Sequence, residues 1–151
     1  MDRPVTLITG TRKGIGKYLA EHYVGLGHQV VGCSRSPLDW SLVGYVHHEA
    51  DVSDEKAVRV LFSSLRKQFG RLDHLINNAG VMALPARKTA DGFEVHFGTN
   101  HFGHFALTGL LLPALKATPS ARVVTVSSGV HMAGDIHFDD LQWKKKYERW
   151  G

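Results

Sequence analysis

The sequence predicts an α/β fold in which an open, doubly wound parallel sheet carries helices on both faces. Short β-branched runs alternate along the chain with longer stretches of helical period, which is the pattern of such a sheet. The 151 residues, 43% of them apolar and 21% charged, suit one globular domain. No repeat, low-complexity stretch or linker divides the chain, so we expect a single domain over residues 1–151.

Five strands are expected from the β-branched runs, and each ends close to a turn or a polar motif. In chain order they cover residues 5–10, 29–34, 44–51, 74–80 and 122–128. We expect them to lie in the order 3-2-1-4-5.

Three helices are expected between the strands, over residues 15–26, 55–69 and 90–117. Asp54 and Asp91 suit N-caps, because a short acidic side chain accepts hydrogen bonds from the first free amides of a helix. Gly27 and Gly70 suit C-terminal stops, since glycine readily adopts the left-handed conformation found there. The connection SRSPLDWSL is too short for more than about a turn of helix.

Composition excludes several classes of protein. The 18 Lys and Arg against 14 Asp and Glu give a pI near 9.3, but the basic residues are scattered without interleaved aromatics, so we expect no nucleic-acid partner. No run approaches the ~20 apolar residues of a membrane span. Met1 is followed by Asp2, Arg3 and Pro4 rather than by a signal segment, which favours a soluble cytoplasmic protein without membrane contact.

The cysteine and the histidine pairs do not indicate a metal site. Cys33 has no Cys or His at zinc spacing, and we expect it to be a packed apolar thiol. His101 and His104 lie one helical turn apart without a third ligand, so packing and surface roles are favoured. His47 and His48 are adjacent, and in a strand they point to opposite faces.

The first chemical signal is TGTRKGIG, residues 9–16, where the first strand gives way to the first helix. Glycines there allow a tight turn, and the free amides of the helix N-terminus favour a phosphate. The spacing of Gly10, Gly14 and Gly16 differs from the G-x-G-x-x-G fingerprint, so a glycine-rich turn without a ligand is the alternative.

Two further motifs lie at strand ends: NNAG, residues 77–80, and VSS, residues 126–128. Open α/β sheets bind ligands at these carboxyl ends. With the glycine turn and an asparagine in the long helix, the motifs resemble those of the short-chain dehydrogenase/reductase family, which has a Rossmann-type sheet. The stretches 89–115 and 122–143 look most like its retinol-dehydrogenase-like branch, whereas residues 5–80 are of a more generic type. A fusion of two family members and ordinary divergence would both produce this contrast.

The resemblance implies a dinucleotide cofactor and the residues that bind it. These are Gly10, Thr11, Arg12, Lys13, Gly14, Ile15 and Gly16 in the turn, Ser34 and Arg35 after the second strand, Asp51 and Val52 after the third, and Asn78, Ala79 and Gly80. Asp51 could instead form an Asx turn. Asn78 could equally brace the backbone.

The end of the second strand favours NADP(H) over NAD(H). A free ribose diol is usually held by a carboxylate at this position, and a 2′-phosphate by cations. Here the acid is absent, Arg35 follows Ser34, and Arg12 and Lys13 stand in the glycine turn. The alternative is that these three cations are merely solvated.

The resemblance also implies a catalytic set of serine, asparagine, tyrosine and lysine. Ser128 would hold the substrate oxygen, and Asn100 would interrupt the long helix and organise water. The tyrosine would be the acid or base, with a lysine four residues later to lower its pKa. Tyr147 does not fit, because four residues later stands Gly151 and the lysines of WKKKYERWG precede it.

We therefore expect a chain truncated before the Tyr-x-x-x-Lys motif, with 129–151 an irregular substrate loop and the last family strands missing. The predicted function is NADP(H)-dependent hydride transfer to or from an alcohol or carbonyl substrate, with a retinoid or steroid suggested by the branch. The alternative is a non-catalytic nucleotide-binding or interaction module, such as one engineered from family fragments. An open edge on the fifth strand predicts a homo-oligomer.

Overall fold

The computed structural model describes residues 3–145 and residue 147. Its sheet has five strands: β1 (Val5–Thr9), β2 (Gln29–Ser34), β3 (Tyr45–Glu49), β4 (His74–Asn77) and β5 (Arg122–Thr125). They pair in parallel in the order β3-β2-β1-β4-β5, which confirms the predicted fold class and strand order. Four strands end one to three residues before their predicted ends, because the motif residues there leave the sheet for loops.

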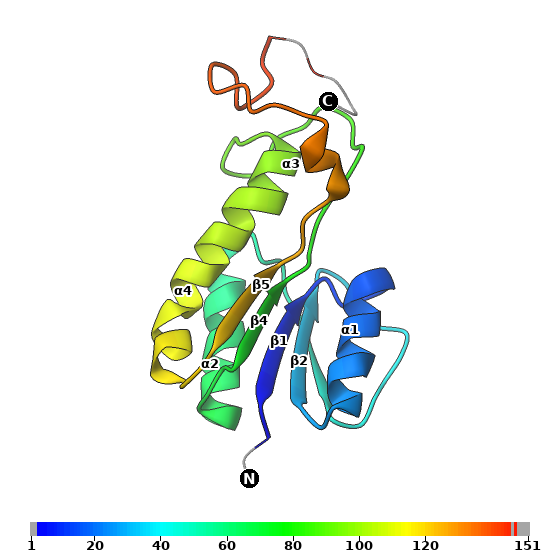
Figure 1. Cartoon of the computed structure of the whole chain (residues 1–151), viewed down its shortest axis with the longest axis vertical. Helices are drawn as coiled ribbons and strands as arrows, with labels where there is room; N and C mark the ends of the chain where they lie inside the picture. The colour runs from blue at the N-terminus through cyan, green and yellow to red at the C-terminus, as the bar shows by residue number, and fades with distance from the viewer. Residues whose placement is uncertain (1–2, 146, 148–151) are drawn as a thin grey trace.

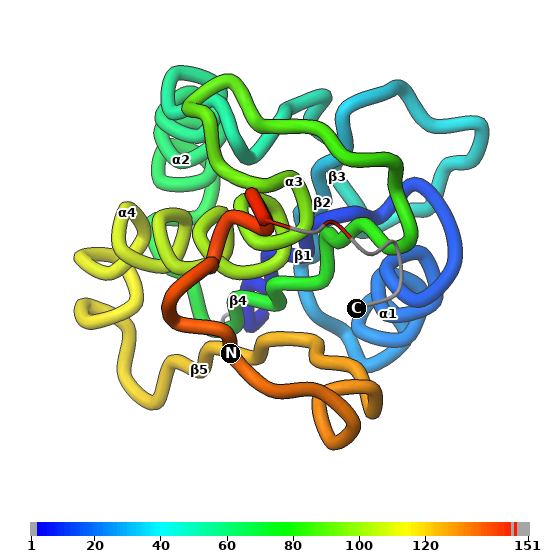
Figure 2. The backbone as a smooth tube through the Cα atoms, turned by 90° about the horizontal axis from the view of Figure 1, so that it is seen from above, coloured from blue at the N-terminus to red at the C-terminus, as the bar shows by residue number. Residues whose placement is uncertain are grey.

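Helices cover both faces of the sheet, as the doubly wound pattern requires. α1 (Gly14–Gly25) lies on one face, and α2 (Glu55–Phe69) and α4 (Gly103–Ala117) lie on the other, as Figures 1 and 2 show. Neighbouring residues of β1 serve opposite faces: Leu7 packs in the cluster with α2 and α4, and Ile8 packs in the cluster with α1.

The predicted signals at the ends of α1 and α2 are confirmed. The Asp54 carboxylate accepts hydrogen bonds from the amides of Lys56 and Ala57 at 2.8 and 3.5 Å. Gly70 ends α2 with a φ of 68°, and Gly27 follows α1 with a φ of 86°. Both values lie in the left-handed region that favours glycine.

The single long helix predicted over residues 90–117 is wrong. α3 (Val95–Phe97) is followed by a π-helical turn, η1 (Gly98–Phe102), and then by α4. Glu94 caps α3 by accepting from the Phe97 amide at 2.8 Å, so Asp91 is not the N-cap. Gly92 adopts a φ of 86° and stops the helix from beginning earlier.

β5 forms one edge of the sheet, and among the described residues it pairs only with β4. Val123 and Val124 are 44% and 46% exposed, which is high for valines in a strand. Beyond β5, the described part of the segment 129–151 contains one short 3-10 turn, η2 (Gly129–Met132), and no strand or α-helix. That part of the segment is irregular.

Candidate functional site

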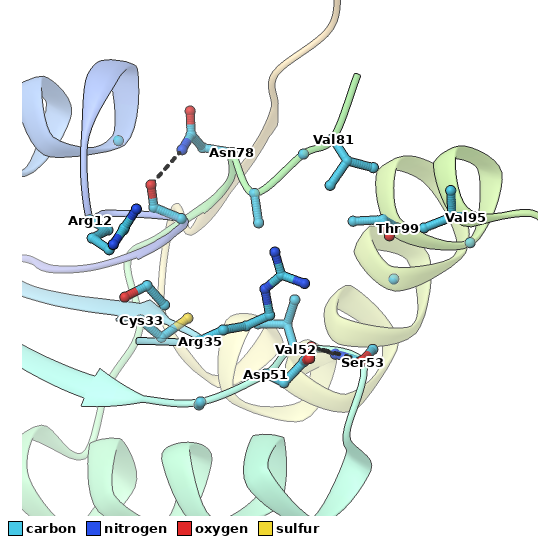
Figure 3. A pocket seen from close by; sticks show the side chains of 18 of the residues that line it. Arg12, Cys33, Arg35, Asp51, Val52, Ser53, Asn78, Val81, Val95 and Thr99 are labelled. Atoms are coloured by element: carbon cyan, nitrogen blue, oxygen red, sulfur yellow. Dashed lines mark hydrogen bonds between the residues drawn. The ribbon is translucent and has the colours of Figure 1, made fainter. Parts of the chain in front are cut away.

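A cavity of about 860 Å³ opens at the carboxyl ends of the strands (Figure 3). Its walls come from the glycine turn after β1, the ends of β2 and β3, the loop after β4 and the region of α3 and η1. β1 lies between β2 and β4, so the cavity is at the point where the strand order reverses. Ligands of open α/β sheets bind at this point.

The glycine turn packs so closely on the NNAG loop that side chains are excluded from it. A Cβ added to Gly10 would lie 2.9 Å from the Ala79 Cα atom, and Gly10 has a φ of 73°. A Cβ added to Gly16 would overlap the Gly10 carbonyl and lie 2.6 Å from the Asn78 Nδ2 atom. Gly14 has open space around it but a φ of 60°. The three predicted glycines are therefore required by this geometry.

The N-terminus of α1 meets the cavity with its amide donors uncapped. Lys13, the N-cap residue, makes no side-chain capping bond, and the first turn carries no acidic residue. Lys13, Gly14, Ile15 and Gly16 all line the cavity. Free amides and the positive end of a helix suit a phosphate, so this wall fits the pyrophosphate of a dinucleotide.

Asn78 braces the glycine turn against the NNAG loop. Its Nδ2 atom donates to the Thr9 carbonyl oxygen at 2.8 Å and to the Gly10 carbonyl oxygen at 3.4 Å, and Figure 3 shows the second of these bonds. In return, the Thr9 hydroxyl oxygen accepts from the amides of Asn78 and Ala79 at 3.0 and 2.9 Å. The bracing role is thus present, and Asn78, Ala79 and Gly80 also line the cavity.

His104 supports the same loop from α4. It is buried, and its Nε2–H donates to the Ala79 carbonyl at 2.7 Å, while burial lowers the pKa of the ring. His101 stacks on Phe97 with ring centres 5.3 Å apart. Both histidines thus have the packing roles predicted for them. Within residues 3–145 and 147, no three His, Cys, Asp or Glu side chains gather where they could hold a metal ion.

Cations dominate the cavity. Arg12, Lys13 and Arg35, which the sequence suggested as cofactor-binding residues, line it, and Figure 3 shows the Arg35 side chain pointing into its middle. Arg87 and Lys88, which were not predicted, join them from the loop after β4. None of the five forms an ion pair with a described residue.

Asp51 is the sole acidic residue among those that line the cavity, and it forms an Asx turn. Its Oδ1 atom accepts from the Ser53 amide at 2.9 Å and from the Ser53 hydroxyl at 2.7 Å. Val52 also lines the cavity and packs against the core under α2. Cys33 is a packed thiol, as predicted, and burial raises its pKa to about 12.

Thr11 does not line the cavity. Its side chain is fully buried and turns toward β3, where its hydroxyl lies 2.7 Å from the Tyr45 hydroxyl. Ser34 does line the cavity, but its hydroxyl donates to the Ser36 carbonyl at 2.7 Å.

Ser128 and Asn100, the two predicted catalytic residues, are also absent from the cavity lining. The Ser128 side chain is exposed and accepts from the Val130 amide at 3.2 Å. Asn100 stands in the π turn, which interrupts the helix as predicted. Its side chain bonds both the amide and the carbonyl of Val81 at 2.9 Å, so it supports the loop after β4.

Tyr147 lies against the loop after β4. Its hydroxyl donates to the Leu84 carbonyl at 2.6 Å and lies 3.5 Å from the His96 Nδ1 atom. Lys144 and Lys145 bond Asp140 through their amides. Lys146 lies outside the described residues.

Glu94, His96 and Tyr147 form a small polar cluster. In it, the His96 Nδ1 atom lies 2.8 Å from the Glu94 Oε1 atom. Burial alone would raise the pKa of Glu94, but hydrogen bonds from the amides of His96 and Phe97 and from the His96 ring outweigh it and lower the pKa. The cluster thus holds a charged carboxylate in a buried position.

In the described part of the chain, no helix has the length and apolar character needed to cross a membrane.

Comparison with known proteins and protein families adds four similarities. The chain is 43% identical to human retinol dehydrogenase 12 over 156 aligned residues, which cover 96% of this chain and 49% of that protein. The chain thus spans about half the length of the curated relatives it matches. Retinol dehydrogenase 12 aligns with both the first and the second half of this chain. The structure of ElxO with NADP bound superposes with a TM-score of 0.74 at 28% identity, covering 89% of this chain and 59% of ElxO.

The 3-ketoacyl-(acyl-carrier-protein) reductase of Brucella melitensis, complexed with NADH, gives a TM-score of 0.62 at 27% identity, covering 76% of this chain and 51% of the reductase. The short chain dehydrogenase family itself matches residues 4–139, which include the glycine turn, the NNAG loop and all five strands. The chain therefore belongs to the short-chain dehydrogenase family of oxidoreductases, nearest to its retinol-dehydrogenase-like branch.

Proposed function

We propose that these 151 residues form the NADP(H)-binding part of an oxidoreductase that acts on an alcohol or a carbonyl. The observation that carries this proposal is the set of cations around the cavity that form no ion pair with a described residue. Arg35 stands at the end of β2, where a carboxylate would be needed to hold a ribose diol, and Arg12 and Lys13 face it from the glycine turn.

The residues of the cavity fit the parts of such a cofactor. The uncapped amides of α1 suit the pyrophosphate, and the glycines let it approach the backbone. Asp51 and Val52 lie at the far wall, where an adenine edge would be bound. Arginine can grip a phosphate with two parallel hydrogen bonds, and lysine adds a point charge.

When bound, the cofactor would supply or accept the hydride. The protein would hold the substrate oxygen and move a proton. We assign the first role to Ser128 and the support of the reacting end of the cavity to Asn100, through its two bonds to Val81. The similarity to human retinol dehydrogenase 12 favours a substrate of apolar, retinoid-like character.

Binding of NADPH and NADH, followed by fluorescence, tests the proposal. Two or three charge-assisted contacts of about 1.5 to 3 kcal/mol each, discounted for exposure, should favour NADPH at least about tenfold. Arg35→Ala should remove most of this preference, whereas Lys116→Ala, an exposed cation near the end of α4, should leave it unchanged. Equal affinities, or an unchanged preference in Arg35→Ala, would refute the assignment to NADP(H).

A second candidate is a non-catalytic nucleotide-binding module. It is favoured by one observation: none of the four tyrosines is followed by a lysine four residues later, and the Tyr147 hydroxyl is committed to Leu84. If the chain binds cofactor but still turns over no aldehyde or ketone after extension by a Tyr-x-x-x-Lys helix and the remaining family strands, this candidate is supported; turnover by the extended chain would refute it.

A further inference from the structure

A continuous line of hydrogen bonds joins the glycine turn to the end of β2 beneath the cavity. The Thr11 hydroxyl lies 2.7 Å from the Tyr45 hydroxyl, which lies 3.0 Å from the His47 Nδ1 atom. On the other side of the ring, the His47 Nε2 atom lies 3.2 Å from the Ser34 hydroxyl oxygen. The Ser34 hydroxyl then donates to the Ser36 carbonyl.

The direction of every bond in this line follows from its last member. Ser34 has one hydroxyl hydrogen and gives it to a carbonyl, so it can only accept from His47. His47 must therefore carry its proton on Nε2, which leaves Nδ1 as an acceptor for the Tyr45 hydroxyl. The Tyr45 oxygen in turn accepts from the Thr11 hydroxyl, because at 2.7 Å it is the closer of the two acceptors of that hydrogen; the Cys33 carbonyl lies 3.4 Å away. Burial lowers the pKa of His47, which favours the neutral ring that this arrangement requires.

Gly32, in the middle of β2, provides independent support. A Cβ added there would clash with the Tyr45 hydroxyl and would lie 2.6 Å from the Thr11 hydroxyl oxygen. The absent side chain leaves room for the two hydroxyls to meet. A glycine inside a strand destabilises it unless something approaches closely, and here the approaching group is the Thr11–Tyr45 pair.

We propose that Tyr45 and His47 are positioning residues that fix the spacing between the two cation-bearing walls of the cofactor cavity. One wall carries Arg12 and Lys13 next to Thr11, and the other carries Arg35 next to Ser34. A ligand group that touches both walls depends on this spacing, and a group that touches one wall does not. The inference rests on the proposed function, in which the 2′-phosphate of NADPH is the group that touches both.

Tyr45→Phe removes only the hydroxyl, and His47→Phe removes both ring nitrogens. Each should lower the NADPH affinity by about three- to tenfold and change the NADH affinity less than about twofold. His48→Phe, on the opposite face of the same strand, and Tyr18→Phe, on the exposed surface of α1, are the matched controls. Thermal unfolding of each variant shows that it is folded at the titration temperature. An unchanged preference in both variants, or an equal fall in His48→Phe, overturns the proposal.

The His47 ring gives a readout that needs no cofactor. In ¹⁵N-labelled protein near pH 8, nitrogen–proton correlation spectra should show the proton of His47 on Nε2, and Tyr45→Phe should shift the Nδ1 resonance. A proton on Nδ1, or an Nδ1 resonance unaffected by Tyr45→Phe, would show that the line of bonds does not exist. If neither cofactor binds the wild-type chain, the proposed function fails, and a His47 proton on Nε2 would then leave the bonds as a purely structural feature and refute the positioning role.

Discussion

The two asparagines of the site, Asn78 and Asn100, offer a comparison of the same chemical change in two environments. Asn78 donates from Nδ2 to the carbonyls of Thr9 and Gly10 inside the turn, in a partly buried place. Asn100 also makes two hydrogen bonds, both to Val81, but its side chain is exposed. We expect Asn78→Ala to destabilise the fold more than Asn100→Ala, although the better hydrogen-bond lengths belong to Asn100.

The expected losses of unfolding free energy depend on whether water can reach the groups that lose a hydrogen-bond partner. A typical hydrogen bond contributes about 1 kcal/mol net, and a shielded group that loses its partner adds a penalty of about 1 to 3 kcal/mol. Asn78→Ala should therefore lower the free energy of unfolding by about 2 kcal/mol, since the Thr9 residue it bonds is fully buried. Around Asn100 water can replace the lost amide, so the loss should stay below about 1 kcal/mol.

Equilibrium unfolding in urea, followed by circular dichroism for the wild type and both variants in one buffer, measures the two changes. Thermal midpoints should fall by roughly 4 to 8 °C for Asn78→Ala, at about 2 to 4 °C per kcal/mol for a chain of this size. If Asn100→Ala is as destabilising as Asn78→Ala, the argument from burial is wrong. If both are neutral, the two bracing roles are wrong.

Three further outcomes are expected. Burial would raise the pKa of Asp73, but hydrogen bonds from Arg71 and from the backbone outweigh it and lower the pKa. The ionised Asp73 therefore stabilises the fold above the ordinary pKa of 3.8, and this stabilisation is lost as the pH falls through the lowered pKa. The free energy of unfolding should thus depend less on pH below about 4 in Asp73→Asn, whereas the exposed Asp39→Asn should keep the wild-type slope. NADPH oxidation with a panel of aldehydes and ketones should show no activity above background, and Tyr147→Phe should not alter this, because the Tyr147 hydroxyl bonds a carbonyl; activity abolished by Tyr147→Phe would make it the proton donor. Sedimentation should show self-association that Val124→Lys on β5 reduces, and a wild type that stays monomeric at high concentration would contradict the open edge.

The sheet and the glycine turn could be predicted because their signals are local. β-branched runs mark the strands, and glycine spacing marks a turn whose φ values and close packing require that residue. The start of the long helix could not be predicted in this way. Asp91 resembles an N-cap in sequence, but the left-handed Gly92 and the buried Glu94 carboxylate decide where the helix begins.

Side-chain directions in loops were the weakest part of the site prediction. The position of Thr11 in the turn was correctly identified, but its hydroxyl turns to Tyr45, a residue of another strand. Arg87 and Lys88 reach the cavity from a loop that no motif marks, so only the folded chain brings them to the other cations. Spacing along a sequence carries information about neither of these contacts.

The π-helical turn at Gly98–Phe102 sets the rotation of α3 about the helix axis relative to α4. It accommodates one residue more than an α-helical turn would, and each residue of an α-helix rotates the chain by roughly 100°. Deleting one residue there would leave Leu107, Leu111 and Leu115 in the core but swing Val95, which lines the cavity, roughly 100° about the helix axis. Insertions and deletions at this turn would therefore alter the shape of the cavity while leaving the core leucines of α4 in place.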